Sequence, residues 1–173
     1  MELKFIEKKG PVFDSPLSTQ KDLDRIGKPD GVEKLEYVFE TIDLIKKQLN
    51  GKIPLIGFIG SPWTVATYLI EGNSTKTFKK VLRILKEDEL FLERLLEQIT
   101  TLSIDYLQKQ VVHGVDITMI FDTWGSLLNE NEYERFSLKY IRKIKEALIL
   151  NDVPLIYYSR GLGDKLNYVE NLN

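Results

Sequence analysis

Three short apolar runs organise the second two thirds of the chain. Residues 53–59, 115–121 and 153–158 are apolar at nearly every position, a pattern typical of strands covered on both faces of a parallel sheet. Small or polar residues follow each run, and the intervening segments are long enough to contain helices. The pattern therefore predicts parallel strands joined by long crossovers, which is an α/β fold.

Apolar residues at helical spacing predict the helices between and before these strands. The expected helices cover residues 32–49, 63–70, 75–85, 88–110 and 130–149. The last of them has the spacing of a capping box, with Asn129 as the cap and Glu132 three residues later.

The N-terminal region follows a different pattern. Residues 3–7 alternate between apolar and charged side chains, and a Lys-Lys-Gly-Pro turn then leads to Val12 and Phe13, which predicts a β-hairpin. Residues 15–30 are rich in Asp, Pro, Ser and Gly and are interpreted mostly as loop. We expect a single domain over residues 1–173, divided into a hairpin at 1–14, a loop and helix at 15–51, and about three βα units at 52–173.

The amino-acid composition argues against several classes of function. The chain has 173 residues, of which 43% are hydrophobic and 29% charged, as in ordinary globular proteins, and its net charge of -2 gives no support for broad nucleic-acid or polybasic membrane binding. Without cysteine, disulfides, thiolate nucleophiles and Cys-ligated zinc are excluded. The apolar runs are too short to span a membrane, and charges interrupt the N-terminus where a signal peptide would be apolar. We therefore expect a cytoplasmic protein.

Candidate site residues follow the three strands, whose carboxyl ends face the same side in right-handed βα units. Together with Tyr68 on the helix after the first strand, they define one expected pocket at this edge of the sheet. These residues are Ser61 and Trp63 after the first strand, Asp122, Thr123 and Trp124 after the second, and Ser159 and Arg160 after the third.

Each candidate also has a structural interpretation. Gly60-Ser61-Pro62 is either a turn with a helix start or an anion site at a helix N-terminus. Trp63 and Trp124 are more often packing residues than stacking platforms. Asp122 is an acid or base, a helix cap, or one half of an ion pair, and Arg160 fits a surface ion pair.

His113 is the only histidine, and it precedes a glycine at a predicted helix end, where it interacts favourably with the helix dipole. The sequence contains no phosphate loop, no metal-ligand cluster and no nucleophile–His–acid set. The residues alone therefore indicate a parallel α/β domain with a pocket of unspecified chemistry.

Several blocks resemble the uroporphyrinogen decarboxylase family, in order and over nearly the whole chain. They are KKGPVFDSPL, PLIGFIGSPWTVATYLIEG, VDITMIFDTWGSLL, ERFSLKYIRKI and VPLIYYSRG. The resemblance implies a (β/α)8 TIM barrel, of which this chain is a part, and an enzyme without cofactor or metal. It implies decarboxylation of the four acetate side chains of uroporphyrinogen III to give coproporphyrinogen III in haem biosynthesis, by a cytoplasmic homodimer.

The resemblance assigns substrate contacts to two residues. Tyr68 in ATYLIEG matches the tyrosine whose hydroxyl lies near the catalytic aspartate, and Thr123 in IFDTW matches the hydroxyl that contacts a substrate carboxylate. Arg160 stands where the family commonly has lysine. A protonated pyrrole accepts the electrons released with CO2, so the site must bind a polycarboxylate, exclude water and stabilise positive charge.

Other family blocks are missing from this sequence. The RQAGR-like block with the substrate-binding arginines, the FSDI-like strand end with the catalytic aspartate and the GHG-like block with a late histidine are absent, so no catalytic residue is assigned. The chain has about half of the family's length, and a closed barrel takes about 250 residues. We expect bare apolar edges and faces, which favour association or poor solubility, and no decarboxylase activity from this chain alone.

Two alternatives remain. A corrinoid or methionine-synthase-like methyltransferase on a related barrel would need zinc held by Cys and His, which this composition disfavours. A non-catalytic remnant, or half of a split protein that binds the rest of the barrel, fits the same motifs.

Overall fold

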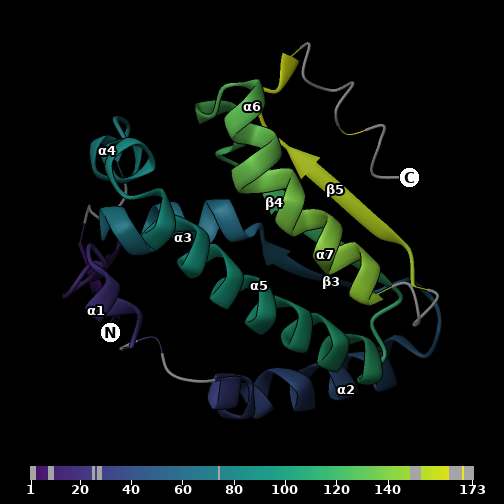
Figure 1. Cartoon of the computed structure of the whole chain (residues 1–173). Coiled ribbons are helices and arrows are strands. Elements are labelled where there is room, and N and C mark those ends of the chain that lie inside the picture. The colour runs from purple at the N-terminus through teal and green to yellow at the C-terminus, as the bar shows by residue number, and fades with distance from the viewer. Residues whose placement is uncertain are drawn as a thin grey trace.

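A parallel β-sheet forms the centre of the computed structural model, which describes residues 3–7, 10–24, 26, 29–73, 75–148, 153–163 and 169. Strands β3 (Ile56–Gly60), β4 (Ile117–Asp122) and β5 (Leu155–Ser159) are parallel and lie in the order β3-β4-β5 (Figure 1). The predicted α/β class with three parallel strands is confirmed. The strands form part of a barrel-like sheet.

The predicted N-terminal hairpin is also confirmed. Strands β1 (Leu3–Ile6) and β2 (Gly10–Phe13) pair antiparallel. The segment interpreted as loop contains a short helix, α1 (Gln20–Leu23). Asp22 makes this turn possible because its carboxylate accepts hydrogen bonds from the backbone N–H groups of Ser18 and Thr19, both at 2.9 Å.

The helices lie close to their predicted positions. They are the 3-10 segment η1 (Pro29–Leu35), α2 (Glu36–Leu49), α3 (Pro62–Glu71), α4 (Lys79–Glu87), α5 (Glu89–Val112), the 3-10 turn η2 (Gly125–Leu127), α6 (Glu130–Tyr133), the π-helix η3 (Glu134–Leu138) and α7 (Lys139–Leu148). Residue 149, the predicted end of the last helix, lies outside the described residues. The capping box at Asn129 and Glu132 is confirmed.

Helix α4 starts later than the expected residue 75. Phe78 has a left-handed backbone, with φ of 48°, and a helix cannot continue through that conformation. The Phe78 ring instead packs against Trp124, with ring centroids 4.6 Å apart.

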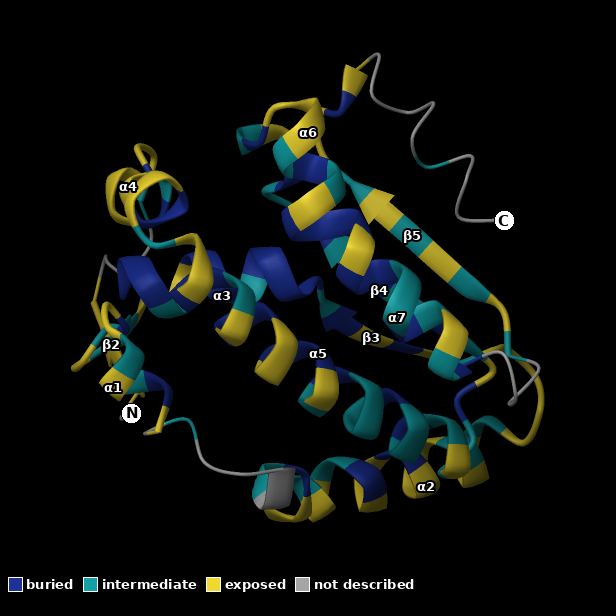
Figure 2. Cartoon of the chain, viewed as in Figure 1, coloured by how far each residue is buried: buried dark blue, intermediate teal, exposed yellow. Residues whose placement is uncertain are grey.

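The described residues cover only one face of the sheet. Helix α5 packs against β3, α3 against β4 and α7 against α5, and all three helices lie in front of the strands in Figure 1. On the opposite face, Phe58 is 60% exposed and Tyr158 44% exposed, and Figure 2 shows exposed positions along β3 and β5. The prediction of strands buried on both faces is therefore wrong for the described chain, whereas the expected bare apolar face is present.

Candidate functional site

The carboxyl ends of the three strands lie side by side. Asp122 of β4 pairs in register with Ser159 of β5, and Gly60 of β3 pairs with Phe121. The Ser159 hydroxyl donates to the carbonyl oxygen of Asp122 at 3.1 Å. The candidate residues that follow the strands therefore lie along one edge of the sheet, but they differ in how deeply they are buried.

Asp122 is fully buried, and its carboxylate accepts four hydrogen bonds. Oδ1 accepts from the Ser61 hydroxyl at 2.6 Å and from the Thr64 hydroxyl at 3.3 Å. Oδ2 accepts from the hydroxyls of Ser137 and Tyr157, both at 2.8 Å. Both oxygens are thus fully engaged by protein donors, which is what a carboxylate without solvent requires.

A second tyrosine extends this network. The hydroxyls of Tyr133 and Tyr157 are hydrogen-bonded to each other. Burial, and then the charge of Asp122, raise the pKa of both phenols above the ordinary value. Both therefore remain neutral near pH 7, and the geometry indicates a structural network rather than a proton relay.

Local backbone geometry brings these side chains together. Ser61 is the N-cap of α3, since its Oγ accepts from the N–H of Thr64 at 3.1 Å, and Pro62 occupies the first turn. The π-helix η3 carries Ser137 to the carboxylate; such turns often occur at functional sites. Gly125 passes so close that a Cβ there would lie 2.5 Å from Asp122 Oδ2.

The two tryptophans form the next layer. Trp63 is fully buried, and its Nε1 donates to the carbonyl oxygen of Trp124 at 2.9 Å. Trp124 is half-buried, and its backbone N–H donates to the Thr64 hydroxyl at 3.3 Å. Its ring lies between Phe78 and Tyr68, the latter with centroids 6.5 Å apart. The Asp122 network therefore fixes the position of the Trp124 ring through Thr64.

Tyr68 is the most accessible of these aromatic residues. It is 39% exposed and lines a cavity of about 350 Å³ with Leu3, Pro11, Phe13 and Asn73. The hairpin is attached here, because the N–H of Phe13 donates to the carbonyl of Gly72 at 2.7 Å. This cavity lies between the hairpin and the end of α3.

The remaining candidate residues differ in how far they are buried. Ser61, Trp63 and Asp122 are completely buried, so the structure places them beneath a site rather than on its surface. Thr123 is half-buried and Arg160 is exposed. Neither of these two side chains has a hydrogen bond or ion pair with another described residue. The cavity that Tyr68 lines has none of the other candidate residues in its wall.

His113 has the structural role expected from its position. It caps the C-terminus of α5, its Nδ1 lies 3.0 Å from Asp43 Oδ2, and its ring stacks on Phe39. Within the described residues, no three His, Cys, Asp or Glu side chains are grouped as metal ligands would be. No helix in the described ranges has the length and apolar character needed to cross a membrane.

The sequence interpretation missed Thr64, Tyr133, Ser137 and Tyr157 as partners of Asp122. A usable signal was present, because Ser137 stands directly between the apolar residues Phe136 and Leu138 in a predicted helix. A small hydroxyl residue in such a position needs a hydrogen-bond partner.

Comparisons with known proteins identify the relatives of this chain. The family model described as uroporphyrinogen decarboxylase (URO-D) matches residues 1–173. A uroporphyrinogen decarboxylase of Ruthia magnifica subsp. Calyptogena magnifica is 44% identical over 163 residues, which are 92% of this chain and 47% of the relative. One from Vibrio campbellii is 42% identical over 167 residues, with 94% and 47% coverage.

A solved structure shows the same fold. A methyltransferase from Methanosarcina mazei superposes with a TM-score of 0.73 at 21% identity, covering 95% of this chain and 48% of the methyltransferase. At that identity the similarity concerns the fold alone. The chain spans about half the length of the curated relatives that it matches.

Proposed function

Because the chain belongs to the uroporphyrinogen decarboxylase family, we propose that it forms one wall of a tetrapyrrole-binding cleft in a decarboxylase. The substrate is uroporphyrinogen III, and the reaction removes CO2 from its four acetate side chains. The complete enzyme acts in the cytoplasm as a homodimer. The chain alone is inactive, because the arginine and aspartate blocks of the family lie outside its sequence.

The observation that carries this proposal is the accessible Tyr68 near the end of α3. It lies within a family block, its ring contacts Trp124, and it borders a cavity beside the hairpin. A hydroxyl there contacts the bound substrate, and the Thr123 hydroxyl on the neighbouring strand end contacts a substrate carboxylate. The apolar rings around Tyr68 exclude water from the tetrapyrrole.

Asp122 has a supporting role in this proposal. All four of its hydrogen bonds come from protein hydroxyls and it is fully buried, so it does not reach a substrate. It holds the β4 turn that presents Thr123 and Trp124. The charged groups that bind the polycarboxylate and stabilise the protonated pyrrole come from polypeptide outside this chain.

A chimera tests the proposal. In the Ruthia magnifica relative, this chain replaces the matched half, and conversion of uroporphyrinogen is measured beside the isolated 173-residue chain. We expect activity from the chimera and none from the chain alone. A folded but inactive chimera would instead support the alternative that this chain is a non-catalytic remnant, and activity of the isolated chain would refute its dependence on further polypeptide.

The same chimera tests the two substrate contacts. Replacing Tyr68→Phe or Thr123→Val removes one hydroxyl, and we expect kcat/KM to fall by about 10- to 100-fold, the range for a lost hydrogen bond to a charged group. Thr101→Val is the matched control, because the Thr101 hydroxyl donates to the backbone carbonyl of Glu97 in its own helix. Unchanged kinetics in both site variants would refute the assigned roles.

A further inference from the structure

A residue with a strained backbone stands directly before α4. Phe78 has φ of 48° and ψ of 34°, in the left-handed region that bulky side chains rarely adopt. The apolar spacing of residues 75–85 favours an earlier helix start, so tertiary contacts impose this conformation. The Phe78 side chain is only 3% exposed, and its ring packs on that of Trp124. Strained residues of this kind are frequent where a functional side chain must be held in place.

The side chain of Glu71 fixes the first turn of α4 to the end of α3. It is only 6% exposed, and its Oε1 accepts from the backbone N–H groups of Lys80 at 2.8 Å and Val81 at 3.0 Å. The Lys80 ammonium donates to the carbonyl oxygen of Glu71 at 3.0 Å. Because Tyr68 belongs to the same helix as Glu71, these bonds also fix Phe78 relative to Tyr68.

The ring of Trp124 is held by packing and not by a hydrogen bond of its own. Its backbone is fixed, since the N–H donates to the Thr64 hydroxyl and the carbonyl oxygen accepts from Trp63 Nε1. The buried Nε1 of Trp124 itself has no hydrogen-bond partner among the described residues. The orientation of the indole ring therefore depends on its contacts with the rings of Phe78 and Tyr68.

These contacts link α3, α4 and the turn after β4 into one unit. Phe78 packs on Trp124, and Trp124 contacts Tyr68 edge to face. Glu71 completes the connection between α4 and the helix that carries Tyr68. We call Glu71, Phe78 and Trp124 the Phe78 clamp. Since closely packed side chains transmit strain, a change within the clamp displaces the accessible ring of Tyr68.

We infer that Phe78 is a positioning residue: it holds the ring of Trp124 and through it places the Tyr68 hydroxyl for contact with the substrate. The substrate contact rests on the proposed function, whereas the placement of the rings rests on the geometry of the clamp. Phe78 is buried and does not itself reach the substrate. Displacement of a substrate-contacting group by about 1 Å can cost about 100-fold in rate.

Tryptophan fluorescence of the 173-residue chain tests the clamp without catalysis. The chain has two tryptophans, of which Trp63 is fully buried, so quenching by acrylamide reports mainly on Trp124. In Phe78→Ala the indole ring is uncovered, and we expect stronger quenching and emission at longer wavelength than in the wild type. Ile84→Ala is the matched control, because it removes a buried side chain from a later turn of the same helix. Its quenching should equal that of the wild type.

Kinetics of the Ruthia magnifica chimera test the positioning role. In Phe78→Ala, we expect kcat to fall by about 10-fold and KM to change by less than about twofold, because the other substrate contacts remain. Phe78→Gly should lower kcat equally, although it is the more stable variant, since glycine adopts the left-handed backbone without strain. Phe78→Met should restore most of kcat, because its flexible apolar side chain keeps the contact with Trp124.

Three outcomes would overturn the inference. They are equal quenching in the wild type and Phe78→Ala, a kcat that follows stability so that Phe78→Gly exceeds Phe78→Ala, and a loss of kcat in Ile84→Ala as large as in Phe78→Ala. The fluorescence readout is independent of catalysis. Stronger quenching of Phe78→Ala together with an inactive wild-type chimera would refute the proposed function and not the Phe78 clamp.

Discussion

Asp122 has a carboxylate whose four hydrogen-bond donors come from three different segments. Ser61 and Thr64 belong to the start of α3, Ser137 to η3 and Tyr157 to β5. A hydrogen bond to a charged acceptor contributes more than one between neutral groups. At the scale of single residues, Asp122 therefore fixes how three elements meet at the strand ends.

Replacing Asp122→Asn tests this role. The amide nitrogen cannot accept a hydrogen bond, so buried hydroxyls lose their acceptor, and we expect the free energy of unfolding to fall by about 2–4 kcal/mol. Urea denaturation followed by tryptophan fluorescence measures the loss, since Trp63 and Trp124 lie next to the Asp122 network. Asp43→Asn, at an exposed pair with His113, should cost less than about 1 kcal/mol. Equal losses in the two variants would contradict the prediction.

The tyrosine pair predicts a pH dependence. Burial and Asp122 raise the pKa of Tyr133 and Tyr157, so the folded protein retains protons that the unfolded chain loses above about pH 10. The stabilisation is complete below that pH and declines as pH rises, by about 1.4 kcal/mol per pH unit for each tyrosine. Burial also raises the pKa of Tyr140 to about 12, which adds to the decline.

Denaturation series from about pH 8 to 10.5, followed by circular dichroism, measure this slope. Tyr157→Phe should lower stability at pH 8 and flatten the decline above about pH 10. Tyr37→Phe, at a side chain that is 65% exposed, is the control and should keep the wild-type slope. A Tyr157→Phe slope as steep as that of the wild type would show that Tyr157 is not the group responsible.

At the scale of elements, the turn between β4 and η2 requires a residue without a Cβ at position 125. A Cβ on Gly125 would lie 2.5 Å from Asp122 Oδ2 and 2.8 Å from Tyr133. Gly125→Ala should therefore destabilise the protein by about 1–3 kcal/mol through overpacking. In the control Gly31→Ala, the added Cβ meets only Leu102 at 4.0 Å, so little change in the denaturation midpoint is expected. A Gly125→Ala variant as stable as wild type would show that the turn shifts freely.

Element types were predictable from the sequence because their signals are local. Apolar runs gave β3, β4 and β5, and the spacing from Asn129 to Glu132 gave the start of α6. Structural features that depend on tertiary contacts were not predictable. The left-handed backbone of Phe78 shortens α4 because its ring packs on Trp124, and the π-helix η3 interrupts a segment whose apolar spacing is continuous.

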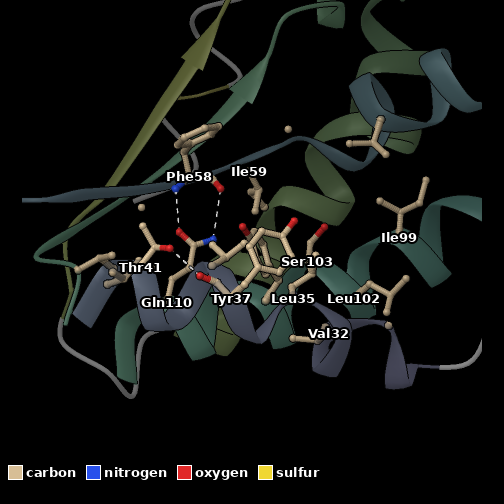
Figure 3. Close-up of a pocket in the computed structure, with 18 of the residues that line it drawn as sticks. Val32, Leu35, Tyr37, Thr41, Phe58, Ile59, Ile99, Leu102, Ser103 and Gln110 are labelled. Atoms are coloured by element: carbon tan, nitrogen blue, oxygen red, sulfur yellow. Dashed lines mark hydrogen bonds between the residues drawn. The ribbon is translucent and has the colours of Figure 1, made fainter. Parts of the chain in front are cut away.

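The candidate site was predictable in location but not in depth. Alternation along β4 places Asp122 on the same face as Thr118 and Ile120, all of them buried under the helices. The sequence identifies the strand end, but it does not say which face the helices cover. For the same reason Gln110, polar and buried on α5, was not distinguishable from a solvated helix residue, although in the structure its amide hydrogen-bonds to the backbone of Phe58 (Figure 3).

At the scale of the whole molecule, the uncovered face of the sheet dominates behaviour in solution. Phe121 lies between Phe58 and Tyr158, with ring centroids 5.7 and 5.8 Å away, so three strands contribute to one aromatic row. Exposed contiguous apolar surface of this kind associates with other apolar surface. We expect the purified chain to form oligomers at micromolar concentration, measured by sedimentation velocity.

The double variant Phe58→Lys with Tyr158→Lys should shift the chain toward the monomer, because two cations on this face oppose its burial against a second copy. The control carries the same charges elsewhere, as Leu90→Lys with Val112→Lys, at side chains 56% and 83% exposed on α5. Net charge rises equally in the two variants, so general repulsion acts on both. Only Phe58→Lys with Tyr158→Lys removes apolar area from the aromatic row. If both double variants dissociated equally, the chain would associate through a surface other than this face of the sheet. A wild-type chain that sediments as a sharp monomer would contradict the prediction directly.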